Sequence, residues 1–266
     1  MPMNWVKRNK YKLMVLIPGL YLLVDGLVHK GMVRVMLPVS FPLFQETSIR
    51  PTVKNKLDFD GKEWIKAVNT TAGIKELDVK VPGFECDVYY VRSGNYFDVH
   101  HDKNTSQGIR LDSLLDIYQS RRMRSCIWLD LKNLRDSIKT EACTELMRLR
   151  KKYGLMNKLL VESNHPECLQ PFNDSGFFTV YYTPYFNPYK VKDSVLKQRV
   201  DRVTNNITKY PINALSGYYF QYPYLHHYFP NYPLMIWSSN DRFSFVNWLF
   251  RKTILAEKAV MIDLHP

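Results

Sequence analysis

Two kinds of hydrophobic pattern alternate along the chain from Trp64 onward. Short apolar runs rich in β-branched and aromatic residues predict strands, and stretches with apolar residues three or four positions apart predict helices. The predicted strands are residues 64–69, 84–91, 125–131, 158–163, 177–182, 214–220, 234–238 and 259–264. The predicted helices are residues 111–120, 136–153, 192–208 and 244–257. Strands that alternate with helices are typical of a parallel sheet covered by helices.

Eight strands of this kind predict an α/β fold, a (β/α)₈ barrel of the TIM type. Such barrels take about 250 residues, so the shorter body of this chain leaves room only for short helices and for no helix after the eighth strand. An open, doubly wound sheet is the alternative. Neither G-x-G-x-x-G nor G-x-x-x-x-G-K-[ST] occurs, and nothing in the sequence therefore indicates nucleotide binding.

The N-terminal segment is basic and then apolar. Lysines and arginines at positions 7, 8, 10 and 12 precede an apolar run, residues 13–28, in which Asp25 is the first acidic residue of the chain. A bilayer core takes about 20 apolar residues, so the run is marginal for a span unless it extends to Leu37. The first alanine is Ala67, which leaves no A-x-A cleavage motif before it.

We therefore expect residues 1–40 to form an uncleaved anchor segment and residues 41–266 to form the barrel. With the basic residues kept inside, a single-pass anchor would place the barrel on the non-cytoplasmic side of the membrane. An ordinary amphipathic or core segment is the competing interpretation of residues 13–28.

Composition narrows the possible partners. The chain carries 37 Lys and Arg against 25 Asp and Glu, a net charge of +12, which suits nucleic acid, an anionic membrane surface or a small anionic substrate. The basic residues are scattered in short runs without a helix-turn-helix or RNP-like pattern, so we expect no nucleic-acid partner. Four cysteines without a C-x-x-C pair predict neither a disulfide scaffold nor a zinc site.

Acidic residues interrupt two of the predicted strands. Glu85 and Asp87 are two positions apart and so lie on one face of a strand, where their charges repel unless a divalent cation lies between them. Asp130 supplies a third carboxylate on another strand, and Lys132 follows it on the same face. An ion pair between Asp130 and Lys132 that caps the strand is the purely structural alternative.

Residues 95–102 (NYFDVHHD) follow a Ser-Gly-Asn turn and predict a hairpin partner for the second strand. His101 and Asp102 form a candidate acid/base unit, because a carboxylate can orient an imidazole and raise its basicity. His100 lies on the opposite face by strand parity and could assist only if the hairpin bulges. Histidines on a surface hairpin without a catalytic role are the alternative.

In order and spacing, these segments resemble the glycerophosphodiester phosphodiesterase and phospholipase C-like barrel superfamily, and more narrowly its menorin-like branch. Residues 64–70 (WIKAVNT) resemble the opening motif "W-x-H-x-x-N-S", and residues 84–88 (FECDV) resemble the "ElDV" strand. Residues 96–102 resemble the "pVxHD" hairpin, and residues 109–118 resemble the leucine-rich segment that follows it. Residues 128–133 (WLDLKN) resemble the "LDFK" strand. The resemblance is good over residues 60–135 and rests elsewhere on the strand count.

The resemblance implies a role for each of these residues. Glu85, Asp87 and Asp130 would bind a divalent metal, Mg or Ca. His101 would be the general acid, and Lys132 would neutralise phosphate charge. Lys66 stands where the family has its other catalytic histidine, and lysine is a poor base at neutral pH.

The resemblance thus implies a metal-dependent phosphodiester hydrolase that acts on glycerophosphodiesters, lipid head groups or phosphodiester-linked polymers. The alternative is a catalytically impaired barrel that binds an anionic ligand or a protein partner, and Lys66 is its chief support. A glycoside hydrolase would need two carboxylates about 5 to 10 Å apart. Glu85 and Glu162 could serve, but no second motif supports that reading.

Overall fold

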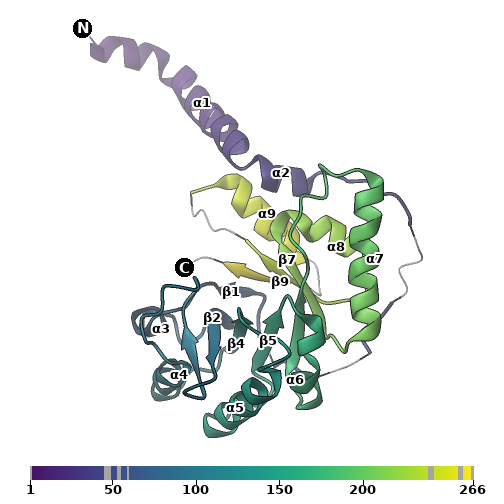
Figure 1. The fold of residues 1–266 in the computed structure, drawn as a ribbon. Coiled ribbons are helices and arrows are strands. Elements are labelled where there is room, and N and C mark those ends of the chain that lie inside the picture. Colours follow the sequence, from purple (N-terminus) through teal and green to yellow (C-terminus); the bar gives the residue numbers. More distant parts are fainter. Residues whose placement is uncertain are drawn as a thin grey trace.

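The fold is a closed ring of eight parallel strands. The computed structural model describes residues 2–44, 49–52, 55–58, 60–238, 243–256 and 260–264. The barrel strands are β1 (Glu63–Ile65), β2 (Gly83–Val91), β4 (Cys126–Leu131), β5 (Leu159–Ser163), β6 (Phe178–Tyr182), β7 (Ala214–Tyr218), β8 (Leu234–Trp237) and β9 (Val260–Leu264). The ring closes because β1 pairs with both β9 and β2. The predicted TIM-type barrel is confirmed, and the open doubly wound sheet is wrong (Figure 1).

One antiparallel strand adds to this ring. β3 (Tyr96–Val99) pairs with the second half of β2, with Val88 opposite Val99 and Val91 opposite Tyr96. The connection turns at Gly94 and at Asn95, whose φ of 48° is in the left-handed region that asparagine tolerates better than most residues. The predicted hairpin is therefore present, and it brings His100 beside Asp87 in the middle of β2, where the backbone N–H of His100 donates to the carbonyl oxygen of Asp87 at 3.1 Å.

Helices surround the barrel. They are α3 (Thr71–Glu76), α4 (Leu111–Ser120), α5 (Lys139–Lys152), α6 (Gln170–Asp174), α7 (Asp193–Lys209), α8 (Tyr222–Tyr228) and α9 (Phe245–Ala256), with 3₁₀ turns η1 (Pro166–Cys168) and η2 (Tyr219–Gln221). All four predicted helices are present within three residues of their predicted starts. Positions 257 and 259, where a predicted helix ends and a predicted strand begins, fall outside the described residues.

Two apolar cores hold these layers together. The core inside the barrel contains a column of three indoles: Trp64 meets Trp128 edge-on at 6.3 Å between ring centroids, and Trp128 meets Trp237 at 5.1 Å. Gly83 is required beside this column, because a Cβ there would overlap the ring of Trp64. The larger core lies between the outer surface of the barrel and its helices.

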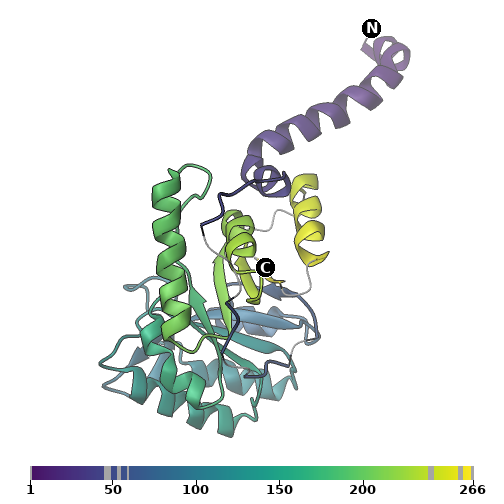
Figure 2. The ribbon, with the colours of Figure 1, turned by 90° about the vertical axis from the view of Figure 1, so that its right-hand side faces the viewer.

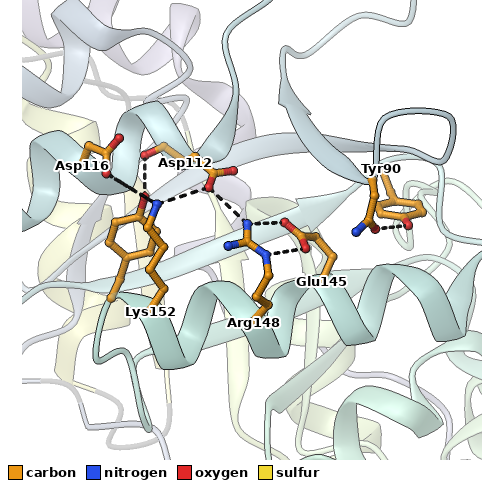
Figure 3. A network of polar contacts seen from close by, with 8 residues as sticks. Tyr90, Asp112, Asp116, Glu145, Arg148 and Lys152 are labelled. Carbon is orange, nitrogen blue, oxygen red and sulfur yellow. Dashed lines mark hydrogen bonds and ion pairs between the residues drawn. The ribbon is translucent and has the colours of Figure 1, made fainter.

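Helices α4 and α5 are joined by a network of ion pairs (Figure 3). Arg148 donates two hydrogen bonds to Glu145, at 2.8 and 2.7 Å, and also reaches Asp112 at 3.2 Å. Lys152 lies within ion-pair distance of Asp112 and Asp116. These basic side chains at the end of α5 thus serve contacts between helices of the same chain.

The N-terminal segment forms two helices, α1 (Pro2–Val28) and α2 (Lys30–Met36), and α1 leads away from the barrel (Figures 1 and 2). No single helix among the described residues is long and apolar enough to span a membrane. Residues 14–28 and 30–36 meet both criteria only when they are taken together, and the two helices are bent by 85°. The predicted single-pass anchor is therefore not supported. The core-segment interpretation does not fit either, because the large apolar side chains between Met14 and Val24 are 45–75% exposed.

A candidate metal centre at the mouth of the barrel

Three carboxylates meet at the C-terminal ends of neighbouring strands. Glu85 and Asp87 point inward from β2, and Asp130 stands opposite Asp87 in the register of β2 and β4. One ligand oxygen from each of the three lies within 4.8 Å of the others, and all three side chains are buried. Cys86 points the other way, into the outer core, as strand parity predicts. The structure thus brings together the three acids that the sequence singled out.

Lys132 lies between two of these acids. Its ammonium is 2.7 Å from Asp87 Oδ1 and also donates a hydrogen bond to Asp130 Oδ2. Burial alone would lower the pKa of Lys132, but the charges of Asp130 and Asp87 outweigh burial and raise that pKa above its ordinary value. The predicted ion pair between Asp130 and Lys132 exists, but Lys132 shares its charge with Asp87 as well.

The acids remain crowded despite Lys132. Burial raises the pKa of Asp130 above its ordinary value, even though Lys132 acts in the opposite direction. Three buried carboxylates beside one ammonium leave an excess of negative charge. A divalent cation that prefers oxygen ligands would relieve this excess, so the donor set fits Mg²⁺ or Ca²⁺.

The loop that follows β1 fixes the orientation of two of the acids. The backbone N–H of Ala67 donates to Glu85 Oε2 at 2.7 Å, and Ala67 adopts a φ of 59° to do so. Asn69 donates from Nδ2 to Asp87 Oδ2 at 2.6 Å and accepts at Oδ1 from the backbone N–H of Asp87 at 2.8 Å. Sequence reasoning misses this role of Asn69, although Asn69 matches the asparagine of the "W-x-H-x-x-N-S" motif.

Trp237 is a second residue that sequence reasoning missed. It ends β8, and its ring lies under two ammonium groups: Lys66 Nζ is 4.6 Å from the ring centroid and Lys132 Nζ is 5.8 Å from it. Cation–π attraction therefore helps to hold Lys66 at the mouth. The only available signal was the position of Trp237 at the end of an apolar strand.

The two hairpin histidines differ in their surroundings. His101 is exposed, and its Nδ1 lies 2.7 Å from Asp102 Oδ1. The charge of His101 lowers the pKa of Asp130, although less than Lys132 does and against the larger effect of burial. His101 therefore lies within electrostatic reach of the acids.

His100 is buried instead. Its ring stacks on Tyr89 at 4.2 Å between centroids, and its two ring nitrogens lie 2.8 Å from the carbonyl oxygen of Asp102 and 3.4 Å from Asp98. Both nitrogens are thus engaged within the hairpin. The idea that a bulge turns His100 toward the site finds no support, and His101 is the histidine available to a substrate.

Glu162 ends β5 and stands opposite Asp130 in the strand register. It is fully buried and accepts a hydrogen bond from Ser216 of β7. Burial, and after it the charge of Asp130, raises the pKa of Glu162 well above its ordinary value, which favours the protonated form. Because Glu162 is fully buried, the structure gives no support to its role beside Glu85 in the glycoside hydrolase reading.

Several solved structures share the fold of this chain. No protein-family model and no curated protein matches the sequence. A glycerophosphodiester phosphodiesterase from Parabacteroides distasonis superposes with a TM-score of 0.52 at 12% identity, over 77% of this chain and 93% of that one. A phosphodiesterase from Oleispira antarctica, solved with its product sn-glycerol-3-phosphate, superposes with a TM-score of 0.51 at 10% identity, over the same shares.

The chain shares its fold with these two phosphodiesterases. The resemblance that the motifs indicated is thus confirmed at the level of the fold. The narrower likeness to the menorin-like branch stays a prediction.

Proposed function

We propose that the chain is a metal-dependent phosphodiester hydrolase whose active site is the mouth of the barrel. One observation carries the proposal: three buried carboxylates from β2 and β4 converge beside Lys132, on a fold shared with glycerophosphodiester phosphodiesterases. The phosphodiesterase solved with sn-glycerol-3-phosphate supports an anionic phosphodiester as the ligand. The substrate would be a glycerophosphodiester, a lipid head group or a phosphodiester-linked polymer.

Glu85, Asp87 and Asp130 would hold the divalent ion, Mg²⁺ or Ca²⁺. When bound, the ion supplies a Lewis acid next to the phosphoryl group. Ala67 and Asn69 keep two of the carboxylates oriented through their hydrogen bonds, which is the usual task of residues that contact metal ligands.

Two ammonium groups provide the remaining positive charge. Lys132 is held by Asp87 and Asp130, next to where the phosphoryl group would bind. Lys66 lies over Trp237, as Lys132 does at a longer distance, and would contact a non-bridging phosphate oxygen. A fixed cation at this position stabilises the charge that develops on the phosphoryl oxygens.

A water molecule or a hydroxyl of the substrate would attack phosphorus, and His101 would protonate the alkoxide that departs as the P–O ester bond breaks. Asp102 lies at Nδ1, so Nδ1 would donate its hydrogen to that carboxylate and Nε2 would be the atom that transfers the proton. The exposure of both side chains lets the leaving group approach from solvent. This proton transfer requires neither His100 nor Glu162.

The test is hydrolysis of bis(p-nitrophenyl) phosphate with Mg²⁺, Ca²⁺ or Mn²⁺. We expect Asp87→Asn and a chelator each to reduce turnover by at least about a hundredfold, because each removes the metal or one of its ligands. Asp136→Asn, which changes an exposed carboxylate before α5, is the matched control and should leave turnover unchanged. Turnover that survives both the chelator and Asp87→Asn would show that the proposed metal site is not the active site.

A further inference from the structure

An extensive apolar surface lies on one side of the molecule. Eleven large apolar side chains of α1 between Met14 and Val28 are 45–75% exposed. The start of α9 adds Phe245 and Trp248, which are 47% and 48% exposed, and the residue Phe243 just before it is 87% exposed. We call these parts of α1 and α9 the apolar face. Exposed patches of this size usually mark an interaction site.

The two parts of the apolar face are fastened to each other. Asp25 is buried, accepts a hydrogen bond at 2.9 Å from the backbone N–H of Val246 at the start of α9, and lies 3.5 Å from His29. The hydroxyl of Tyr21 donates to the carbonyl oxygen of Phe243. The acidic residue within the apolar run therefore serves to dock α1 onto α9.

The apolar face lies on the mouth side of the barrel. Helix α9 follows β8, which ends at the mouth with Trp237, and it runs back toward the opposite end of the barrel. Its far end confirms this direction, because the carbonyl oxygen of Leu255 accepts a hydrogen bond at 3.0 Å from Lys62, just before β1. Helix α2 packs against α9 and against η2, which directly follows β7 (Figure 2).

The exposed residues of α1 surround the helix. Met14, Val15, Leu16 and Ile17 are consecutive, and each is more than 60% exposed. A helix that docks on one protein partner presents a single stripe of apolar residues, whereas apolar residues on all sides suit a lipid environment. The four basic positions before residue 13, with no acidic residue before Asp25, add attraction to anionic lipids.

We propose that the apolar face binds an anionic phospholipid bilayer and thereby turns the mouth of the barrel toward lipid head groups. Trp248 suits this position because indoles prefer the boundary between water and lipid, and Lys252, 4.7 Å from its ring centroid, can extend toward the phosphates. The choice of a lipid head group as substrate rests on the proposed function, whereas the binding itself does not.

Sedimentation with vesicles tests the binding. The full chain is mixed with phosphatidylcholine vesicles that contain about a quarter phosphatidylserine, the anionic lipid of such surfaces. We expect it to sediment with them and to bind pure phosphatidylcholine less. Phe245→Ser combined with Trp248→Ser should weaken binding about tenfold or more, since two large apolar groups no longer enter the interface.

Met156→Ser is the matched control, because Met156 is 61% exposed in the segment after α5 and lies outside the apolar face. It should bind vesicles as the wild type does. Equal binding by the double variant, or a chain that stays in the supernatant as a dimer, would overturn the proposal.

Turnover of soluble bis(p-nitrophenyl) phosphate separates the two proposals. The double variant should retain it, because neither residue belongs to the metal site. Vesicle binding without soluble turnover in the wild type would refute the proposed hydrolase and leave the bilayer surface standing. Turnover without vesicle binding would refute only the proposal that the apolar face binds a bilayer.

Discussion

The side-chain amide of Asn69 fixes the orientation of one carboxylate in the acid cluster. It contacts Asp87 through both its oxygen and its nitrogen, so the carboxylate cannot rotate away from its neighbours. We expect Asn69→Ala to weaken divalent-ion binding about 10- to 100-fold, the usual cost of losing a residue that orients a metal ligand. Calorimetric titration with Mn²⁺ measures this directly.

Asn205→Ala, on the exposed side of α7, is the matched control for that titration. An Asn69→Ala variant that bound Mn²⁺ as tightly as the control would show that the amide does not orient the site.

Lys66 is the residue at which the chain departs from the family pattern. Its ammonium lies over Trp237, so position 66 faces the mouth of the barrel. We expect Lys66→His to increase hydrolysis of bis(p-nitrophenyl) phosphate by about 10- to 100-fold, because imidazole accepts protons at neutral pH and lysine does not.

Lys75→His, at an exposed position on α3, is the control for an effect of an added histidine away from the site. Lower turnover in Lys66→His than in the wild type would mean that the loss of the Lys66 charge outweighs the gain of a base at this position.

The strands of the barrel depend on tight packing at its axis. Gly83 leaves room on β2 for the ring of Trp64, and any Cβ would overlap that ring. We expect Gly83→Ala to reduce the free energy of unfolding by about 1–3 kcal/mol, as overpacking does. Urea unfolding followed by circular dichroism measures the loss.

Gly26→Ala is the control for Gly83→Ala, because a Cβ at Gly26 on α1 meets nothing within 4 Å. If both variants unfolded at the same urea concentration, the ring of Trp64 would have to be free to move.

The elements of the barrel were predictable because each carries a strong local signal. Strands such as β4 and β5 are short, mostly apolar runs with one acidic residue each, and α4 has apolar residues at a helical period. The position of α1 was not predictable, because it depends on a hydrogen bond between Asp25 and Val246, which are 221 positions apart. Its composition alone resembles that of a membrane-spanning segment.

The site was predictable where its residues share a strand. Parity along β2 and β4 was enough to place Glu85, Asp87 and Asp130 on inward faces. Trp237 comes from β8, which only closure of the ring brings near these acids, and no short motif marks it. Three-dimensional proximity of this kind leaves no trace in local spacing.

At the scale of the whole molecule, the site should couple metal binding to stability. The excess of buried negative charge disfavours the metal-free fold, and a ligand that binds only the folded chain stabilises it by about 2.7 kcal/mol at a hundred times its Kd. For a chain of this size we expect Mg²⁺ or Ca²⁺ to raise the Tm by about 5–10 °C. Thermal unfolding with and without the ion measures the shift.

Asp130→Asn should abolish that increase, while Asp136→Asn should keep it, since only the first contributes to the acid cluster. An equal rise in both variants would assign the effect to ions bound elsewhere.

Ring closure through β1 and β9 has a consequence for biosynthesis. The last strand of the sheet is the hydrogen-bonded neighbour of the first, with Glu63 beside Ile262. While the chain is still on the ribosome, β1 and β8 therefore each present an unsatisfied edge, and such edges invite aggregation. A variant truncated before residue 260 would keep both edges open, because it lacks the strand that pairs with each of them.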